Sequence, residues 1–187
     1  MPYAVVLYLD SKDAKPLRQT ISLLAQKNIA PYMQDSSIPP HVTLAIYDEL
    51  KCQTCEQKIS ALARKVSGFD LFFSFIGLFQ TDEPVVFIAP TVTDQLLSIH
   101  HILHETLKDD AKDPWEYYLP GRWVPHCSLA VEFPPQNTME AIQICRQLSL
   151  PLSIRVASLG VVQFQPAVPL YHYDLSTRKG NQSFLNK

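Results

Sequence analysis

Short apolar runs alternate with longer amphipathic runs along the whole chain. Apolar and β-branched residues such as YAVVLYL at 3–9 are typical of a strand, and apolar residues that recur every three or four positions are typical of a helix. Two segments rich in proline and polar residues, 28–40 and 109–124, predict loops. The pattern predicts strands at 3–9, 41–47, 69–80, 84–89, 126–133, 152–164 and 170–175, and helices at 13–27, 49–66, 93–107 and 138–148.

The predicted elements repeat once. The order strand, helix, strand, helix, strand occurs twice, and each time the strand after the long loop opens with similar residues, PHVTLA at 40–45 and PHCSLA at 125–130. A weaker echo, SFIGLFQ at 74–80 and ASLGVVQ at 157–163, follows the helix after each motif. We therefore predict an α+β fold in which residues 1–187 form one bilobal domain by internal duplication, with two pseudo-twofold-related lobes, each an antiparallel sheet with flanking helices, around a central cleft.

Composition and charge narrow the class of protein. The chain has 187 residues, of which 47% are hydrophobic, and this is enough for a buried core. Its net charge of −2 and its scattered basic residues provide no positive stripe for long nucleic acids or anionic membranes. The first apolar run has no cationic lead, and no run approaches the ~20 residues that span a bilayer. We expect a cytoplasmic monomer that binds neither membranes nor long duplex nucleic acid.

The repeated motif places one imidazole and one hydroxyl on the same side of a strand. Side chains alternate between the two faces of a strand, so His41 and Thr43 point the same way, as do His126 and Ser128. Composition alone predicts such a pattern far less than once in this chain, yet it occurs twice. If the lobes are related by a pseudo-twofold axis, the two pairs face each other across the cleft and converge on one ligand.

Two histidines on opposite sides of one bond suit a reaction that needs an acid and a base together. Imidazole has a pKa near ~6.5, so one ring can hold a proton while the other lacks it, above all when a phosphate lies between them. Such a pair can hydrolyse a phosphodiester, because the neutral ring deprotonates water and the cationic ring protonates the leaving oxygen. The hydroxyls of Thr43 and Ser128 would donate to the non-bridging oxygens, and the scheme requires no metal and no cofactor.

The two motifs, His41-Val-Thr43-Leu and His126-Cys-Ser128-Leu, in a duplicated chain of this length, resemble those of the 2H phosphoesterase superfamily, specifically its 2′-5′ RNA ligase-like and RNA 2′,3′-cyclic phosphodiesterase branch. The resemblance implies the bilobal fold and hydrolysis of the 2′,3′-cyclic phosphates of RNA ends or small nucleotides to 2′-phosphates, with the reverse 2′-5′ ligation as a minor activity. By the same resemblance, His41 is the acid that protonates the leaving 3′-oxygen and His126 is the base that activates water.

Four further residues are candidates for substrate binding. Arg122 and Trp123 lie in the long loop before the second motif, where Arg122 could neutralise phosphate and Trp123 could stack on a base. The alternative for this pair is a solvated arginine and a tryptophan that anchors the loop. Phe79 and Phe164 lie near the ends of the two echo strands and are candidates to line the site, although aromatic residues in strands are commonly core residues.

The remaining patterns predict no metal site and no cofactor. Cys52 and Cys55 have the spacing of half a zinc knuckle or a redox pair, but no second pair follows at a suitable distance, so reduced structural cysteines are favoured. His100, His101 and His104 share one predicted helix without the glutamate of a zincin motif, and we expect a partly exposed helix surface there. The five glycines form neither a P-loop nor a dinucleotide-binding motif.

Two alternative functions stay open from the sequence. The same histidines could act on another small substrate, either a cyclic phosphate derived from ADP-ribose or a linear oligonucleotide. The chain could also be a non-catalytic nucleotide-binding module, but arginine or lysine would hold phosphate more strongly than two histidines and two hydroxyls. The expected partner in each case is a small nucleotide or an RNA terminus.

Overall fold

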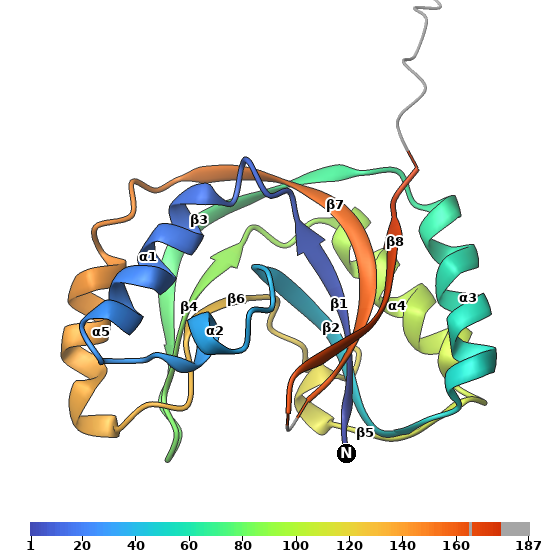
Figure 1. Cartoon of the computed structure of the whole chain (residues 1–187). Helices are drawn as coiled ribbons and strands as arrows, with labels where there is room; N and C mark the ends of the chain where they lie inside the picture. Colours follow the sequence, from blue (N-terminus) through green and yellow to red (C-terminus); the bar gives the residue numbers. More distant parts are fainter. Residues whose placement is uncertain (165, 177–187) are drawn as a thin grey trace, which may run out of the picture.

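The computed structural model describes residues 1–164 and 166–176, and it confirms the predicted α+β class with an antiparallel sheet. Figure 1 shows the sheet as an arch with helices at both ends. Within the described residues, no helix combines the length and the apolar character needed to cross a bilayer. The strands are β1 (Tyr3–Leu9), β2 (His41–Leu50), β3 (Phe69–Phe79), β4 (Val85–Pro90), β5 (Ala111–Pro114), β6 (Cys127–Ala130), β7 (Leu152–Gln163) and β8 (Val168–Asp174), the helices are α1 (Lys15–Gln26), α2 (Tyr32–Asp35), α3 (Cys52–Lys65), α4 (Asp94–Leu107) and α5 (Thr138–Cys145), and the 3-10 turns are η1 (Glu116–Tyr118) and η2 (Pro135–Asn137).

The described strands form one continuous antiparallel sheet. Their order is β5-β2-β1-β7-β3-β4-β6, with β8 paired to β7. The sequence predicted a separate sheet for each lobe, but β3 pairs with β7, from Phe69 opposite Val156 to Phe73 opposite Leu152, and joins the two halves. The six strands from β2 to β6 are arranged symmetrically in this order. Counted from one end they are β2, β1 and β7, and counted from the other end β6, β4 and β3 occupy the same positions. This symmetry supports the proposal that the chain arose by duplication.

The helices exchange partners between the two halves of the sequence. α1 connects β1 to β2, yet it packs against α5 and β6, and α4 follows β4 in the second half, yet it packs against α3 and β2. In Figure 1, α1 and α5 therefore lie at one end of the arch, and α3 and α4 lie at the other. Each end of the sheet is covered by one helix from each half of the sequence, so the two halves share one core.

The two faces of the sheet have different surroundings. In β1, Val5 and Leu7 point into the large core that the helices cover. Ala4, Val6 and Tyr8 point to the opposite face, where they form a smaller apolar cluster, because successive side chains of a strand alternate between the faces. The strand that carries the first motif pairs with β1, and its imidazole and hydroxyl lie on this second face.

Both predicted loops contain short regular elements. α2 lies in the first loop, and β5 and η1 lie in the second. Because β5 pairs with the end of β2, that strand runs on to Leu50, beyond its predicted end at 47. β6 is shorter than the predicted strand 126–133, because Glu132 adopts a left-handed φ of 50° that turns the chain out of the sheet. The helix predicted at 49–66 begins later, at Cys52.

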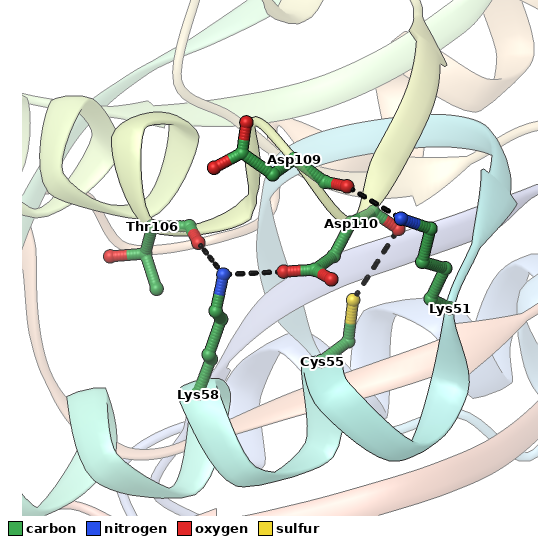
Figure 2. A network of polar contacts seen from close by, with 6 residues as sticks. All are labelled: Lys51, Cys55, Lys58, Thr106, Asp109 and Asp110. Atoms are coloured by element: carbon green, nitrogen blue, oxygen red, sulfur yellow. Dashed lines mark hydrogen bonds and ion pairs between the residues drawn. The ribbon is translucent and has the colours of Figure 1, made fainter.

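A polar network ties α3 to the end of α4 (Figure 2). Lys58 forms an ion pair with the carboxylate of the buried Asp110, and its Nζ also donates to the carbonyl of Thr106 at 3.1 Å. The Nζ of Lys51 donates to the carbonyl of Asp109 at 2.8 Å. These contacts fix the C-terminal end of α4 against α3 and help to hold α4 in place over the sheet.

Cys55 belongs to the same network. Its buried thiol donates to the carbonyl of Asp110 at 3.8 Å, as a structural residue would. The side chain of Cys52 lies outside the described residues. Cys127 and Cys145 are also buried, and burial raises the pKa of each thiol to about 12. At neutral pH these two residues are therefore protonated core residues and poor nucleophiles.

Candidate active site

The first half of the candidate site is built on β1 and β2. His41 opens β2, and its Nδ1 lies 2.8 Å from the carbonyl oxygen of Pro39. A carbonyl only accepts hydrogen bonds, so Nδ1 carries a hydrogen and Nε2 is the atom that can take up or release a proton. In the sheet, His41 pairs with Tyr8 and Thr43 with Val6, which places the four side chains on one face. The ring of Tyr8 meets the imidazole edge-on, with the centroids 6.1 Å apart.

The second half repeats this geometry on β4 and β6. The Nδ1 of His126 lies 2.7 Å from the carbonyl oxygen of Val124, so this ring has the same tautomer as His41 when it is neutral. Ser128 pairs with Phe87 across the two strands. The imidazole of His126 packs against the rings of Phe79 and Phe87, with centroid distances of 4.9 and 5.2 Å.

The proline of each motif explains why the two histidines are oriented alike. Pro40 and Pro125 each precede the histidine and follow the residue whose carbonyl the imidazole contacts. Proline restricts the residue before it to extended backbone, and this fixes the direction of that carbonyl. The repeated P-H pair is therefore a local device that orients an imidazole and selects its tautomer.

The echoed glycines make room for the aromatic rings beside the histidines. A Cβ at Gly160 would lie 2.4 Å from the ring of Tyr8, and a Cβ at Gly77 would lie 2.3 Å from the ring of Phe87. Sequence reasoning missed Tyr8 and Phe87 as site residues, because the pairing of distant strands cannot be deduced from periodicity. The available signal was the pair of echoed glycines, since glycine in a strand often marks a close approach.

The two motifs meet around one cavity. The sheet curves so strongly that β2 and β6, which lie near its opposite ends, contact each other. A cavity of about 190 Å³ is lined by His41, Thr43 and Ser128, together with apolar residues of the smaller cluster such as Val6. The ring of His126 lies close enough to His41 for its charge to act on that imidazole. The structure thus brings together the four residues that the motifs predicted.

Burial lowers the pKa of both motif imidazoles below the usual value. For His41 the hydrogen bond to the carbonyl of Pro39 opposes this effect, and the charge of His126 lowers the pKa further. For His126 the hydrogen bond to the carbonyl of Val124 opposes the effect of burial on its pKa. Both rings are therefore neutral near pH 7 in the unliganded protein, and their protonation is coupled.

The two predicted aromatic residues lie at the site. Phe79 packs edge-on against His126, as described above. Phe164 lines the same cavity as His41, and its ring meets that of Trp115 edge-on at 5.7 Å. A role for either ring in substrate binding stays a prediction, and of the two only Phe164 lines the cavity.

Arg122 and Trp123 are placed differently from the predicted binding role. Arg122 is exposed and forms an ion pair with Glu116, away from the cavity lining. The Nε1–H of Trp123 donates to the carbonyl of Thr43 at 3.0 Å, and its ring stacks on His100 with the centroids 4.1 Å apart. These contacts favour the alternative of an anchored loop over a ring that is free to stack on a base.

The prediction of a partly exposed histidine surface on α4 is wrong for His100. His100 is only 2% exposed, and His104 is half-buried. The Nε2 atoms of both lie within 3.0 Å of the carbonyl oxygen of Tyr118, because the loop before the second motif folds over the helix. Only His101 of the three is exposed. Among the described residues, no group of three or more histidine, cysteine or acidic side chains is arranged to hold a metal ion.

Two histidine–hydroxyl pairs that an arched antiparallel sheet brings together define the class of the 2H phosphoesterases. A family model described as "2'-5' RNA ligase superfamily" matches residues 28–166, and the chain belongs to that superfamily. The resemblance that the two motifs suggested is thereby confirmed. None of the curated proteins that were compared matches the chain.

Several solved structures share the fold. A structure of Escherichia coli LigT complexed with 3′-AMP is 17% identical, with a TM-score of 0.59 over 95% of this chain and 100% of LigT. TT0787 of Thermus thermophilus is 16% identical, with a TM-score of 0.63 over 95% of this chain and 100% of its own. Usb1 of Kluyveromyces marxianus is 11% identical, with a TM-score of 0.50 over 90% of this chain and 97% of its own. At these identities the similarity concerns the fold.

Proposed function

We propose that this protein hydrolyses 2′,3′-cyclic phosphates of small nucleotides or RNA ends to 2′-phosphates without a metal ion, with 2′-5′ ligation as the minor reverse reaction. The observation that carries the proposal is the matched pair of imidazoles. Each Nδ1 is tied to a main-chain carbonyl, so each Nε2 is free for proton transfer, and the hydroxyls of Thr43 and Ser128 line the cavity beside them.

The two histidines can accept and donate the protons that the reaction transfers. The Nε2 of His126 takes a proton from water as the water oxygen attacks phosphorus, and the bond from phosphorus to the 3′-oxygen breaks. The Nε2–H of His41 passes its proton to the departing 3′-oxygen. Thr43 and Ser128 donate hydrogen bonds to the two non-bridging oxygens, on which negative charge accumulates in the transition state.

The substrate itself supplies the protonation state that this scheme requires. Before binding, burial holds the pKa of both rings low, so neither ring is charged near pH 7. A phosphate anion beside an imidazole favours its charged form and raises its pKa. Binding of the cyclic phosphate therefore recruits one proton to the pair, and this proton is the one that the leaving oxygen receives.

The charges around the cavity favour a substrate with a single phosphate. A larger hollow of about 810 Å³ adjoins the catalytic cavity and is lined by four acidic residues, Asp35, Asp82, Glu83 and Glu132, of which Glu132 lines both spaces. Among the described residues, no lysine or arginine lines either of them. Further phosphates would be repelled on this side, so a cyclic mononucleotide is favoured over the diphosphate of an ADP-ribose derivative.

The alternatives are weaker on the same observations. LigT, a structural neighbour, has been crystallised with 3′-AMP and also with ATP and NADP+, so this fold accepts nucleotides of several sizes in that protein. A binding module would need fixed cations for phosphate, whereas the cavity here is lined by the neutral imidazole of His41 and by two hydroxyls. Oriented, titratable rings are the requirement of catalysis.

The test is product formation from a 2′,3′-cyclic mononucleotide and from a short RNA that carries this terminus, in buffer with EDTA. We expect a 2′-phosphate product from the wild type and losses of about 10²- to 10⁴-fold in kcat for His41→Ala and for His126→Ala. The matched control is His101→Ala, which removes an exposed histidine of α4 and should leave kcat unchanged. A folded wild type that turns over neither substrate would overturn the proposal.

The preference for a single phosphate has its own test. Adding a 5′-phosphate to the cyclic mononucleotide should lower kcat/KM, and Glu132→Gln should recover part of that loss, because it removes one of the charges that line the cavity. Glu140→Gln changes an exposed carboxylate of α5 that lines neither space and serves as the control. Equal effects of both variants on the two substrates would contradict this preference.

A further inference from the structure

One hydrogen bond joins the side chain of Trp123, in the loop before the second motif, to the backbone of the first motif. The Nε1–H of Trp123, three residues before His126, donates at 3.0 Å to the carbonyl oxygen of Thr43, two residues after His41. The donor lies on the loop that leads into β6, and the acceptor lies on β2. The two strands reach each other only through the curvature of the sheet, so this bond spans the junction between the halves of the site.

Two histidines of α4, the buried His100 and the half-buried His104, hold the donor loop in place. The ring of His100 stacks on Trp123 with an interplanar angle of 1°, and its Nε2 donates to the carbonyl of Tyr118 at 2.9 Å. The Nε2 of His104 donates to the same carbonyl at 3.0 Å, and the hydroxyl of Tyr47, on β2, contacts its Nδ1 at 3.2 Å. The loop is therefore fixed to α4 and, through Trp123, to the strand of the first motif, and α4 itself contacts that strand through Tyr47.

The loop also reaches the second imidazole. The loop forms a turn in which the backbone N–H groups of Arg122 and Trp123 donate hydrogen bonds to the carbonyl of Leu119, at 3.0 and 3.1 Å. Tyr118, whose carbonyl the two histidines share, places its ring 6.5 Å from that of His126. A displacement of Trp123 would thus be transmitted to the residues that carry and flank His126.

We propose that Trp123, held by His100, is a positioning residue that sets the separation between His41 and His126. This inference rests on the proposed function, since a phosphodiester needs an acid and a base at a fixed distance on its two sides. Trp123 does not line the cavity, so its effect is expected on the rate of the chemical step rather than on substrate binding. Small misplacements of catalytic groups are sufficient for large losses in rate.

The test is Trp123→Phe, which keeps an aromatic ring against His100 and removes the Nε1–H. We expect kcat for the cyclic mononucleotide to fall about 10- to 100-fold with little change in KM. The matched control is Trp115→Phe, because the Nε1–H of Trp115 donates to the exposed side chain of Asp48 at 2.9 Å and joins no motif. A kcat for Trp123→Phe equal to that of the control would overturn the proposal.

A second readout separates this proposal from the catalytic one. In an NMR titration of the histidine ring protons, wild-type His41 and His126 should titrate as a coupled pair, and Trp123→Phe should weaken that coupling whether or not the protein turns over substrate. If Trp123→Phe fails to fold, His100→Phe keeps the stacked ring and removes the bond to Tyr118. It should lower kcat by a smaller factor, and an unchanged kcat together with unchanged titration curves would contradict the proposal.

Discussion

The two halves of the site hold their histidines through the same backbone contact but surround them with different side chains. In each half, a proline sets the carbonyl that holds Nδ1 of the histidine. His41 lies against Tyr8, whose ring also stacks on the exposed His172 with the centroids 5.1 Å apart. His126 packs instead against two phenylalanine rings that also pack against each other. The motif thus fixes orientation and tautomer, while the surrounding strands decide the environment in which each ring titrates.

The difference shows how one repeated motif can supply two different catalytic roles. An acid and a base need the same atom, Nε2, presented to the substrate in opposite protonation states. In both halves the backbone carbonyl that holds Nδ1 directs Nε2 toward the substrate. The different side chains around His41 and His126 can make one ring protonated and the other neutral. The predictions below either break the equivalence of the halves or measure how far it extends.

The largest expected effect separates the acid from the base. On a 2′,3′-cyclic substrate whose 3′-oxygen is replaced by sulfur, the thiolate leaves without a proton, so loss of the acid should matter little. We expect His41→Ala to recover most of its loss of about 10²- to 10⁴-fold on this substrate, and His126→Ala to recover none. Steady-state rates on the oxygen and sulfur substrates provide the measurement. Recovery by His126→Ala alone would reverse the two roles and keep the pair.

Removal of the hydroxyl of Thr43 or of Ser128 should lower kcat by a similar factor, because each half of the site supplies one hydroxyl. Thr43→Val and Ser128→Ala each remove one donor to a non-bridging oxygen while keeping the strand, and each should lower kcat by roughly 10². The comparison of the two variants is the measurement, with thermal melting as the check on folding. A loss confined to one variant would show that the phosphate is held from one side.

The echoed glycines should differ in their effect on stability. Gly160→Ala would bring Cβ to 2.4 Å from the ring of Tyr8 and to 2.8 Å from the carbonyl of Tyr171, whereas Gly77→Ala meets only the ring of Phe87 among its three nearest atoms. A ring can turn aside more easily than main chain, so we expect losses of about 3 and about 1 kcal/mol, respectively, in the free energy of unfolding. Denaturant unfolding measures both values, and a larger loss for Gly77→Ala would contradict the geometry.

The smallest expected effect is on the pH profile. Because burial lowers the pKa of both His41 and His126, the bell-shaped profile of kcat/KM should have its maximum below about pH 6.5. The bound phosphate raises the pKa of the ring that it contacts, so the maximum of kcat should lie at higher pH than that of kcat/KM. A common maximum above pH 7 for both parameters would show that burial does not control the pair.

The sequence was sufficient for the local parts of this molecule. A run of apolar and β-branched residues predicted β1 at its observed bounds. The P-H-x-(S/T) frame predicted His41, Thr43 and Ser128, which line the cavity, and His126, whose charge acts on His41. Both are local signals, because alternation along a strand and the restriction by proline act over two or three residues. The duplication stays a prediction, which the symmetric strand order supports.

Contacts between distant segments could not be predicted in this way. His100 belongs to a histidine pattern without the glutamate of a zincin motif, for which the sequence predicted a partly exposed helix surface, yet the loop that carries Trp123 covers it. Trp123 looked like a platform for a base because of its place near the motif, but its indole is used to join the loop to β2. Periodicity describes which face of an element is apolar, and it does not identify the segment that packs against that face.

The exchange of helices between the halves bears on how such a site can arise. If the chain arose by duplication, two copies of one repeat would have closed a shared core by exchanging helices, as α1 and α4 do here. In such a pair of identical chains both histidines would have identical neighbours. Once the copies share one chain, a mutation beside one histidine leaves the other untouched, so joining them makes specialisation of the two rings accessible to selection.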